Sequence, residues 1–399
     1  MINPSIHGWI DKYFAEQKHK EDEIVIDEVE FYEATRKTGF IFGHIVAVDT
    51  IIPIDIDNWL PIEISKISLL NTLFKVHCLV TKKVDSVKFT SDCVAFYKSL
   101  NPKSSSIFKI LSSNSNVQNL EEIIHTRVQT NEDIFSKNFS HVITNALSFI
   151  DVLAFKKFLE LGEIPEKYSN KIEEIVIGIV SISLKVKTGK SVHDELLQKL
   201  FESSVRYNKF SNASSKNIEE LDLSYLNDEI EKLYIVDLAG ISLWSDEKVE
   251  NEERYFMFKL GENLAIKDEQ IIKNIDFINY FITKYKSEIP YFNFSNPVKH
   301  FYDTTTESVG VLINRNKKRL IKEIRQSKEL MYLLAKSTHK DLDKEEKKKV
   351  KKQLLDICKT VPSLTIFLLP GGALLLPILI KFIPRMLPSA FNENSNEDE

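Results

Sequence analysis

Hydrophobic residues recur at helical spacing along much of the chain. Residues 171–186, "KIEEIVIGIVSISLKV", and residues 271–282, "IIKNIDFINYFI", each carry an apolar stripe with polar positions between. The stripes consist of Ile172, Ile175, Val176, Ile179 and Val180 in the first segment and Ile271, Ile275, Ile278 and Ile282 in the second. Recurrence at i, i+3, i+4 and i+7 is typical of a helix with one face against a core. We therefore predict an all-α, multi-domain helical bundle.

Other segments are shorter or less regular. "NPSIHGWIDKYF" predicts a short helix after Pro4 with Trp9, Ile10 and Phe14 on one face. "EIVIDEVEFYEA", beginning at Glu23, fits either a strand or a helix. Polar stretches predict loops at 101–106 and 112–119 and a linker at 208–217. The expected regions are an N-terminal helical region (1–150), a helical bundle (151–300), basic amphipathic helices (301–352), a membrane segment (353–391) and an acidic tail (392–399).

Positive charge concentrates between residues 315 and 352. The whole chain has a formal net charge of −5, yet this segment holds fifteen Lys or Arg against six Asp or Glu. Leu320, Ile324 and Met331 form a helical stripe within it. With Asp343 as N-cap, Glu346 occupies the third helical position, which is the capping-box arrangement. Two basic helices are therefore expected to lead into the segment that follows.

That next segment is apolar and uncharged from residue 360 to 380. A continuous helix of this length rises about 30 Å, the thickness of bilayer hydrocarbon. Pro362, Pro370 and Pro377, with Gly371 and Gly372 between them, disfavour a straight helix. A membrane span with broken helices and a buried soluble helix pair both remain open, and the absence of charge favours the membrane.

Charge on either side of the apolar segment predicts its orientation. The basic cluster precedes it, whereas the tail "NENSNEDE" is acidic. By the positive-inside rule the large N-terminal part stays in the cytoplasm and the short tail crosses the membrane. The first residues contain no basic region followed by an apolar one, so no signal peptide is expected there. Insertion is therefore expected from the C-terminal end, or the segment lies in the membrane interface.

The composition supports a helical, reduced protein. Glycine and proline are scarce, at 11 and 12 residues, which favours long helices over many short strands. The three cysteines, Cys78, Cys93 and Cys358, form no metal-binding spacing and suit a reducing compartment.

Residues 356–391, "DICKTVPSLTIFLLPGGALLLPILIKFIPRMLPSAF", resemble the core of the leucine-zipper and EF-hand-containing transmembrane (LETM) family. Mitochondrial members carry a similar pattern of prolines, "LLP", "LK" and "MLPSTF". The matching positions are Val361, Pro362, Pro370, Leu375 to Pro377, Lys381, Pro384, Met386, Leu387, Pro388, Ser389 and Phe391. The likeness fades upstream of Ser327 and covers under a fifth of the chain.

The resemblance implies a bacterial-type member located in the cytoplasmic (inner) membrane. Family members are linked to potassium/proton or calcium/proton exchange, to ribosome binding and to membrane-protein biogenesis. Mitochondrial members place a carboxylate between the two central prolines, and the matching position here is Ala373. Exchange requires an ionisable group within the bilayer, so this departure ranks exchange below binding.

A second resemblance covers residues 234–282, which are similar to the helical TerB-like domains of tellurite-resistance proteins. In those domains an acidic turn between two helices can hold a metal. Asp246, Glu247, Glu250 and Glu253 fall in that turn, although its usual glycine is absent. A solvated acidic helix start explains these residues better than a metal site does.

No arrangement of residues indicates an enzyme. "TGKS" at 188–191 lacks the first glycine of a phosphate-binding loop, because Leu184 stands there. The histidines are scattered without catalytic spacing. No cofactor is expected.

The leading hypothesis is a membrane-anchored, LETM-like protein that binds ribosomes or other partners at the cytoplasmic face of the membrane. Cation/proton exchange is the alternative, and a purely structural scaffold is a third. The expected partners are membrane lipid, the ribosome and a second copy of the chain, but not DNA. Basic docking residues are expected at Lys347, Lys348, Lys349, Lys351 and Lys352. Ordinary juxtamembrane charge explains most of this cluster, and an electrostatic dock for anionic lipid or ribosomal RNA is its functional interpretation.

Overall fold

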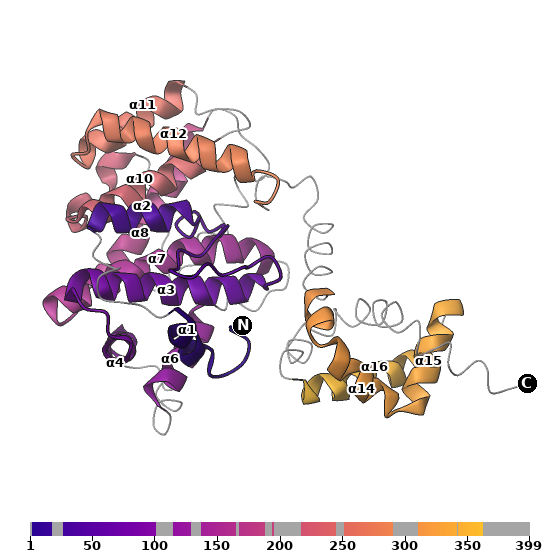
Figure 1. The fold of residues 1–399 in the computed structure, drawn as a ribbon. Helices are drawn as coiled ribbons and strands as arrows, with labels where there is room; N and C mark the ends of the chain where they lie inside the picture. The colour runs from indigo at the N-terminus through magenta and orange to yellow at the C-terminus, as the bar shows by residue number, and fades with distance from the viewer. Residues whose placement is uncertain are drawn as a thin grey trace, which may run out of the picture. The chain divides into compact units, whose positions relative to one another are not determined.

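Helices form all the regular structure in the described part of the chain (Figure 1). The computed structural model describes residues 2–17, 27–100, 115–128, 137–164, 167–187, 194, 217–244, 251–289, 310–340 and 342–361. The chain divides into two compact units, one of residues 1–57 and 61–295 and one of residues 58–60 and 296–399. The all-α prediction is confirmed for these residues.

The first unit contains ten α-helices in the described residues, besides two short 3-10 turns. The helices are α1 (Trp9–Gln17), α2 (Glu28–Lys37), α3 (Pro61–Thr81), α4 (Ser86–Leu100), α6 (Asn116–Val128), α7 (Lys137–Leu161), α8 (Tyr168–Val186), α10 (Glu229–Leu243), α11 (Asn251–Asn263) and α12 (Asp268–Tyr285). The turns are η2 (Ile218–Glu220) and η3 (Leu223–Tyr225). Figure 1 shows the α-helices of this unit stacked, with α3 and α7 beside each other, then α8 and α10, and α11 and α12 at one end. Residues of both expected regions, 1–150 and 151–300, belong to this one unit.

The centre of the first unit is built from helices buried on several faces. Helix α8 buries fourteen of its 19 residues, among them Ile177 and Ile182, which lie off the predicted stripe. Helix α10 likewise buries twelve of 15. Helix α10 accordingly has only weak amphipathicity, because neighbours cover it nearly all round.

Capping side chains determine where several helices begin. "EIVIDEVEFYEA" is helical from Glu28, since the Asp27 carboxylate accepts a hydrogen bond of 2.8 Å from the Glu30 amide. The predicted loop at 112–119 is wrong in its second half, because α6 begins at Asn116. Ser115 and Gln118 exchange backbone-to-side-chain hydrogen bonds of 3.3 and 3.1 Å, which start a helix within a polar run.

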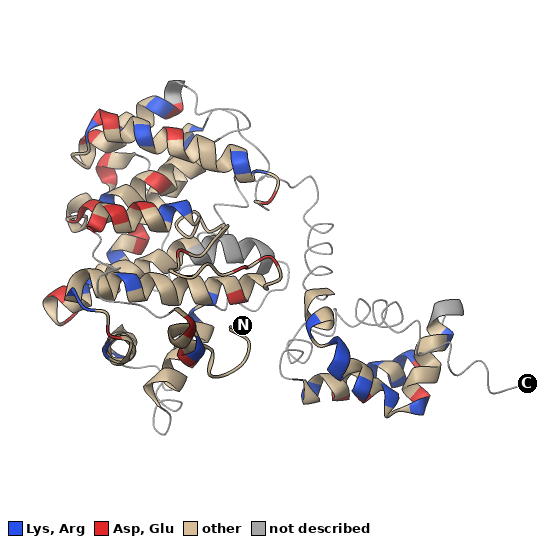
Figure 2. Cartoon of the chain, in the orientation of Figure 1, with Lys and Arg blue, Asp and Glu red and all other residues tan. Residues whose placement is uncertain are grey.

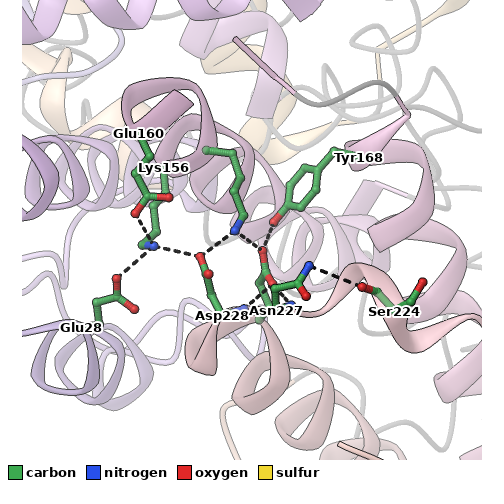
Figure 3. A network of polar contacts seen from close by, with 9 residues as sticks. Glu28, Lys156, Glu160, Tyr168, Ser224, Asn227 and Asp228 are labelled. Carbon is green, nitrogen blue, oxygen red and sulfur yellow. Dashed lines mark hydrogen bonds and ion pairs between the residues drawn. The ribbon is translucent and has the colours of Figure 1, made fainter. Parts of the chain in front are cut away.

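A buried lysine joins three helices of the first unit (Figure 3). Lys156, on α7, is only 3% exposed at its side chain. Its Nζ lies 2.9 Å from Glu28 on α2, 2.6 Å from Glu160 on α7 and 2.8 Å from Asp228 before α10. Burial lowers the pKa of Lys156, but hydrogen bonds to the three carboxylates outweigh it and raise the pKa well above its ordinary value. The lysine is therefore charged in the folded protein.

The same network extends to the start of α10 and to α8. Asp228 and Glu231 form a capping box at the first turn of α10. The Tyr168 hydroxyl, on α8, donates to Glu231 Oε1 at 2.5 Å, and Lys157 lies 2.9 Å from Asp228. Figure 3 shows Tyr168 and Asp228 within this network. The backbone donors at this helix start are thus satisfied by the capping side chains of α10 itself, and Lys156, Lys157 and Tyr168 from the neighbouring helices contact the same carboxylates.

A second buried pair attaches α2 to α10 and α12. The Arg36 guanidinium lies 2.9 Å from the Asp237 carboxylate, and the Tyr32 hydroxyl donates to Asp237 at 2.6 Å. Arg36 also donates to the Asn274 carbonyl at 3.1 Å and lies 4.1 Å above the Phe277 ring. Burial raises the pKa of Asp237 despite the adjacent arginine.

Candidate docking surface

Three helices form the described part of the second unit apart from its first turn. They are α14 (Lys317–Arg325), α15 (Lys328–His339) and α16 (Lys344–Thr360), and each packs against the other two. Their shared core is small and aliphatic. It comprises Leu320, Ile324, Leu330, Leu334, Val350, Leu354, Ile357, Cys358 and Val361. The predicted stripe through Leu320 and Ile324 is confirmed, whereas Leu330 takes the buried place expected for Met331.

The basic segment holds one helix more than the two predicted. Ser327 separates α14 from α15, and its hydroxyl accepts a hydrogen bond of 3.2 Å from the Leu330 amide. A serine at this position is a strong N-cap. The signal was present in the sequence at 327 but was hidden by the continuous run of charge.

Asp343 and Glu346 begin α16 with the predicted capping box. The Glu346 amide donates to Asp343 at 2.9 Å, and the Asp343 amide donates to Glu346 at 3.1 Å. This pair satisfies two backbone donors at the first turn. The start of the basic helix is therefore fixed.

Helices α15 and α16 run antiparallel, and polar pairs join them along one seam. The pairs are Lys336 with Glu346, Lys349 with Glu329 at 2.9 Å, Gln353 with Glu329 at 2.8 Å and Ser327 with Gln353 at 2.7 Å. The seam uses the carboxylates of Glu329 and Glu346. Lys349 is thus engaged within the unit, which separates it from the other lysines predicted for docking.

Four other lysines of α16 lie on a different side of the helix. At about 100° per residue, Lys344, Lys348, Lys351 and Lys352 lie within about 100° of one another and away from Lys349 and Gln353. We call these four lysines the free face. All four are exposed, and none has an ion pair or hydrogen bond with any other described residue. Figure 2 shows the concentration of basic residues on α14 and α16.

Lys347 is also exposed, in the first turn of α16. It lies on the helix above the buried Val350 and Leu354 rather than on the free face. The five predicted docking residues therefore occupy three environments. Lys348, Lys351 and Lys352 share the free face, Lys349 belongs to the seam, and Lys347 borders the free face about 40° from Lys351.

The free face is suited to phosphate groups. Side chains four residues apart on a helix are neighbours, so the face presents closely spaced positive charges. Lysine acts as a point charge toward phosphate. Tyr332 on α15 is exposed, but no aromatic residue lies on α16. Without stacking groups, attraction to a charged backbone is favoured over reading of bases.

The predicted membrane motif lies outside the described residues, as does the acidic tail. Its members are Pro362, Pro370, Gly371, Gly372, Pro377, Lys381, Pro384, Met386, Leu387, Pro388, Ser389 and Phe391. Among the helices that are described, none combines the length and apolar composition needed to cross a membrane. The last described residue, Val361, is fully buried in the second unit.

The candidate acidic turn is described at one position only. Asp246, Glu247 and Glu250 fall outside the described residues, while Glu253 lies in α11 and is fully buried. The described residues contain no group of three or more His, Cys, Asp or Glu side chains able to hold a metal ion. A buried carboxylate also differs from the solvated helix start expected at Glu253.

Comparison with known proteins points to the same end of the chain. Residues 342–399 match the family model described as "LETM1-like, RBD". The match begins one residue before the N-cap of α16 and includes the free face. No curated protein and no solved structure matches the chain.

Proposed function

We propose that this protein is a membrane-anchored docking factor that holds ribosomes at the cytoplasmic face of a bacterial membrane. The free face of α16 contacts ribosomal RNA, and the apolar segment after Val361 provides the anchor. The observation that carries the proposal is the coincidence of an uncompensated lysine face with the LETM1-like match at 342–399.

Electrostatic attraction supplies most of the binding in this proposal. A protein that neutralises several phosphates releases counterions, so its affinity falls steeply as salt rises. Among the described residues, Lys344, Lys348, Lys351 and Lys352 form no ion pair or hydrogen bond that would have to be displaced, and Asp356, one turn after Lys352, is paired with Lys359. The face is therefore available to phosphate without the loss of an internal ion pair.

The apolar segment supports anchoring. Residues 360–380 contain no charged side chain, and the basic unit precedes them. Basic residues next to an apolar segment favour the cytoplasmic side. Anchored in this way, the free face works close to the membrane, where ribosomes that synthesise membrane proteins are found.

Ribosome capture by proteoliposomes tests the docking face. Full-length protein with Lys344→Glu, Lys348→Glu and Lys352→Glu should lose capture, because three attractive charges become repulsive. A control with Lys83→Glu, Lys267→Glu and Lys273→Glu alters three exposed lysines of the first unit by the same total charge. This control should retain capture.

Lys349→Glu provides a second control within α16. This substitution disrupts the contact with Glu329 and leaves the four lysines of the free face in place. It should therefore lower the stability of the unit and leave ribosome capture largely unchanged. Equal capture by the free-face variant and the native protein would place the ribosome contact elsewhere.

A further inference from the structure

The free face of α16 is one of two basic surfaces in the second unit. Helix α14 has its own, made of Lys318, Lys322 and Arg325, which we call the α14 face. All three side chains are exposed and lack an ion pair or hydrogen bond with the other described residues. At about 100° per residue they lie within about 60° of one another, opposite the buried Leu320 and Ile324. This face lies wholly outside the segment that matches the family model, residues 342–399.

Two hydrogen bonds fix where α14 lies along α16. The Arg319 guanidinium donates to the carbonyl of Thr360, the last residue of α16. At the other end, Ser327, two residues after α14, donates to Gln353 at 2.7 Å. Helix α14 therefore flanks residues 353–360, whereas α15 flanks the earlier half of α16.

This position places the Lys318 end of the α14 face next to the start of the apolar segment, with Arg325 about 10 Å further along α16. Val361 is fully buried in the unit, and the uncharged apolar stretch of the sequence continues directly from it at Pro362. Lys348, by contrast, lies about 18 Å along the helix axis from Thr360. Surface potential falls off within about 8–10 Å at physiological ionic strength. Charges on α14 are thus closer to the segment's entry point than most of the free face.

We infer that the α14 face docks on anionic phospholipid headgroups around the point where the chain enters the bilayer. The inference rests on the proposed function, because it requires the apolar segment to insert. Juxtamembrane clusters of Lys and Arg are attracted to anionic lipid, with each residue strengthening association about fivefold. Lipid contact at α14 would leave the earlier half of α16 open to the ribosome.

A fluorophore attached near the α14 face tests the inference. The three native cysteines are buried, and burial raises the pKa of the Cys358 thiol to about 11, so an introduced exposed cysteine is labelled selectively. Gln326→Cys places a polarity-sensitive label on an exposed, uncharged position at the end of α14. Glu345→Cys places the same label at the far end of α16 as a control.

Full-length labelled protein is reconstituted into phosphatidylcholine vesicles and into an equal mixture of phosphatidylcholine and phosphatidylglycerol. We expect emission from position 326 to shift to the blue only in the anionic vesicles and to return in 1 M salt, where the Debye length is about 3 Å. Position 345 should show no shift. Lys318→Glu, Lys322→Glu and Arg325→Glu together should abolish the emission shift while ribosome capture persists. Glutamine at the same three positions is the milder variant, to be used where the charge reversal disturbs folding, and it should weaken the emission shift.

The possible failures are distinguishable. Identical emission from position 326 in neutral and anionic vesicles, with the protein resistant to carbonate extraction, overturns the lipid-docking inference alone. Extraction of the protein by carbonate overturns membrane anchoring and the inference with it.

Discussion

Asp343 and Glu346 show how single residues position the docking face. Their reciprocal hydrogen bonds fix the first turn of α16, and Lys344, Lys347 and Lys348 follow at once. A helix without such a cap frays at its end. The orientation of the first lysines therefore depends on this pair.

Removal of the cap is our first prediction at this scale. Asp343→Ala should destabilise the first turns of α16 by about 1 kcal/mol, a factor of about five in the opening equilibrium. Hydrogen exchange of α16 amides measures the effect. Glu345→Ala, an exposed neighbour outside the capping box, is the matched control. Equal exchange in both variants would show that the cap does not hold the helix start.

Among the described residues, His44 is one of three largely buried histidines, with His77 and His125, whose lowered pKa values make the stability of the first unit depend on pH. Burial lowers the pKa of His44 to about 4, below its ordinary value of 6.5. The folded state therefore binds fewer protons than the unfolded state between these values, so unfolding takes up protons. The contribution of His44 is complete above about pH 6.5 and is lost as pH falls toward 4.

His44→Gln should flatten this dependence. The melting temperature of the native protein should fall more between pH 7 and pH 5 than that of the variant. Parallel slopes in the two proteins would contradict the assignment to His44.

At the scale of elements, buried charge joins helices that are distant in the sequence. Lys156 connects α7 with Glu28 on α2 and with Asp228 at the start of α10. Removal of one partner from a buried ion pair leaves the others desolvated without compensation. The network therefore specifies how these helix ends meet.

Lys156→Met should lower the free energy of unfolding by about 2–3 kcal/mol, somewhat less than for a fully buried pair because Glu28 and Glu160 keep solvent contact. Lys171→Met removes an exposed pair with Glu174 and should cost less than about 0.5 kcal/mol. Denaturant titration compares the two. A loss for Lys156→Met as small as for Lys171→Met would mean that the network contributes little.

The sequence predicts which segments form helices, but not which neighbouring helices cover each of their faces. Stripes at Ile172 and Ile271 predict α8 and α12 because apolar spacing reports one buried face. Burial of Ile177 and Ile182 depends on which helices surround α8, and no local pattern contains that information. Similarly, the sequence places Lys349 in a basic run, but only the position of Glu329 on α15 shows that Lys349 belongs to the seam.

At the scale of the whole molecule, a large helical unit is followed by a small basic one and an apolar segment. The described helices of both units and their buried side chains lie before residue 362, so the chain should still fold after deletion of residues 362–399. We expect the truncated protein in the soluble fraction with the circular dichroism spectrum of a folded helical protein. Its persistence in carbonate-washed membranes would show that another part of the chain anchors it.

The sequence predicts which segment forms the candidate docking surface, but not how its lysines are divided among different faces. Positive charge at 315–352 and the motif after Val361 stand out in the sequence, and the family match supports the second. The separation of a seam, a free face and the α14 face arises from how three short helices pack. Helix α14 was predicted as basic, but its place beside Thr360 depends on a long-range hydrogen bond.

Flotation of cell membranes through a density gradient tests the central claim most directly, with the protein and ribosomal RNA measured in the same fractions. At low salt both should float, because the apolar segment holds the protein and the free face holds the ribosome. In 1 M salt the protein should still float while the portion of ribosomal RNA that depends on it is released, since phosphate contacts are screened and an apolar anchor is not. Protein left in the soluble load at low salt, or ribosomal RNA that floats equally with and without the protein, would contradict the account.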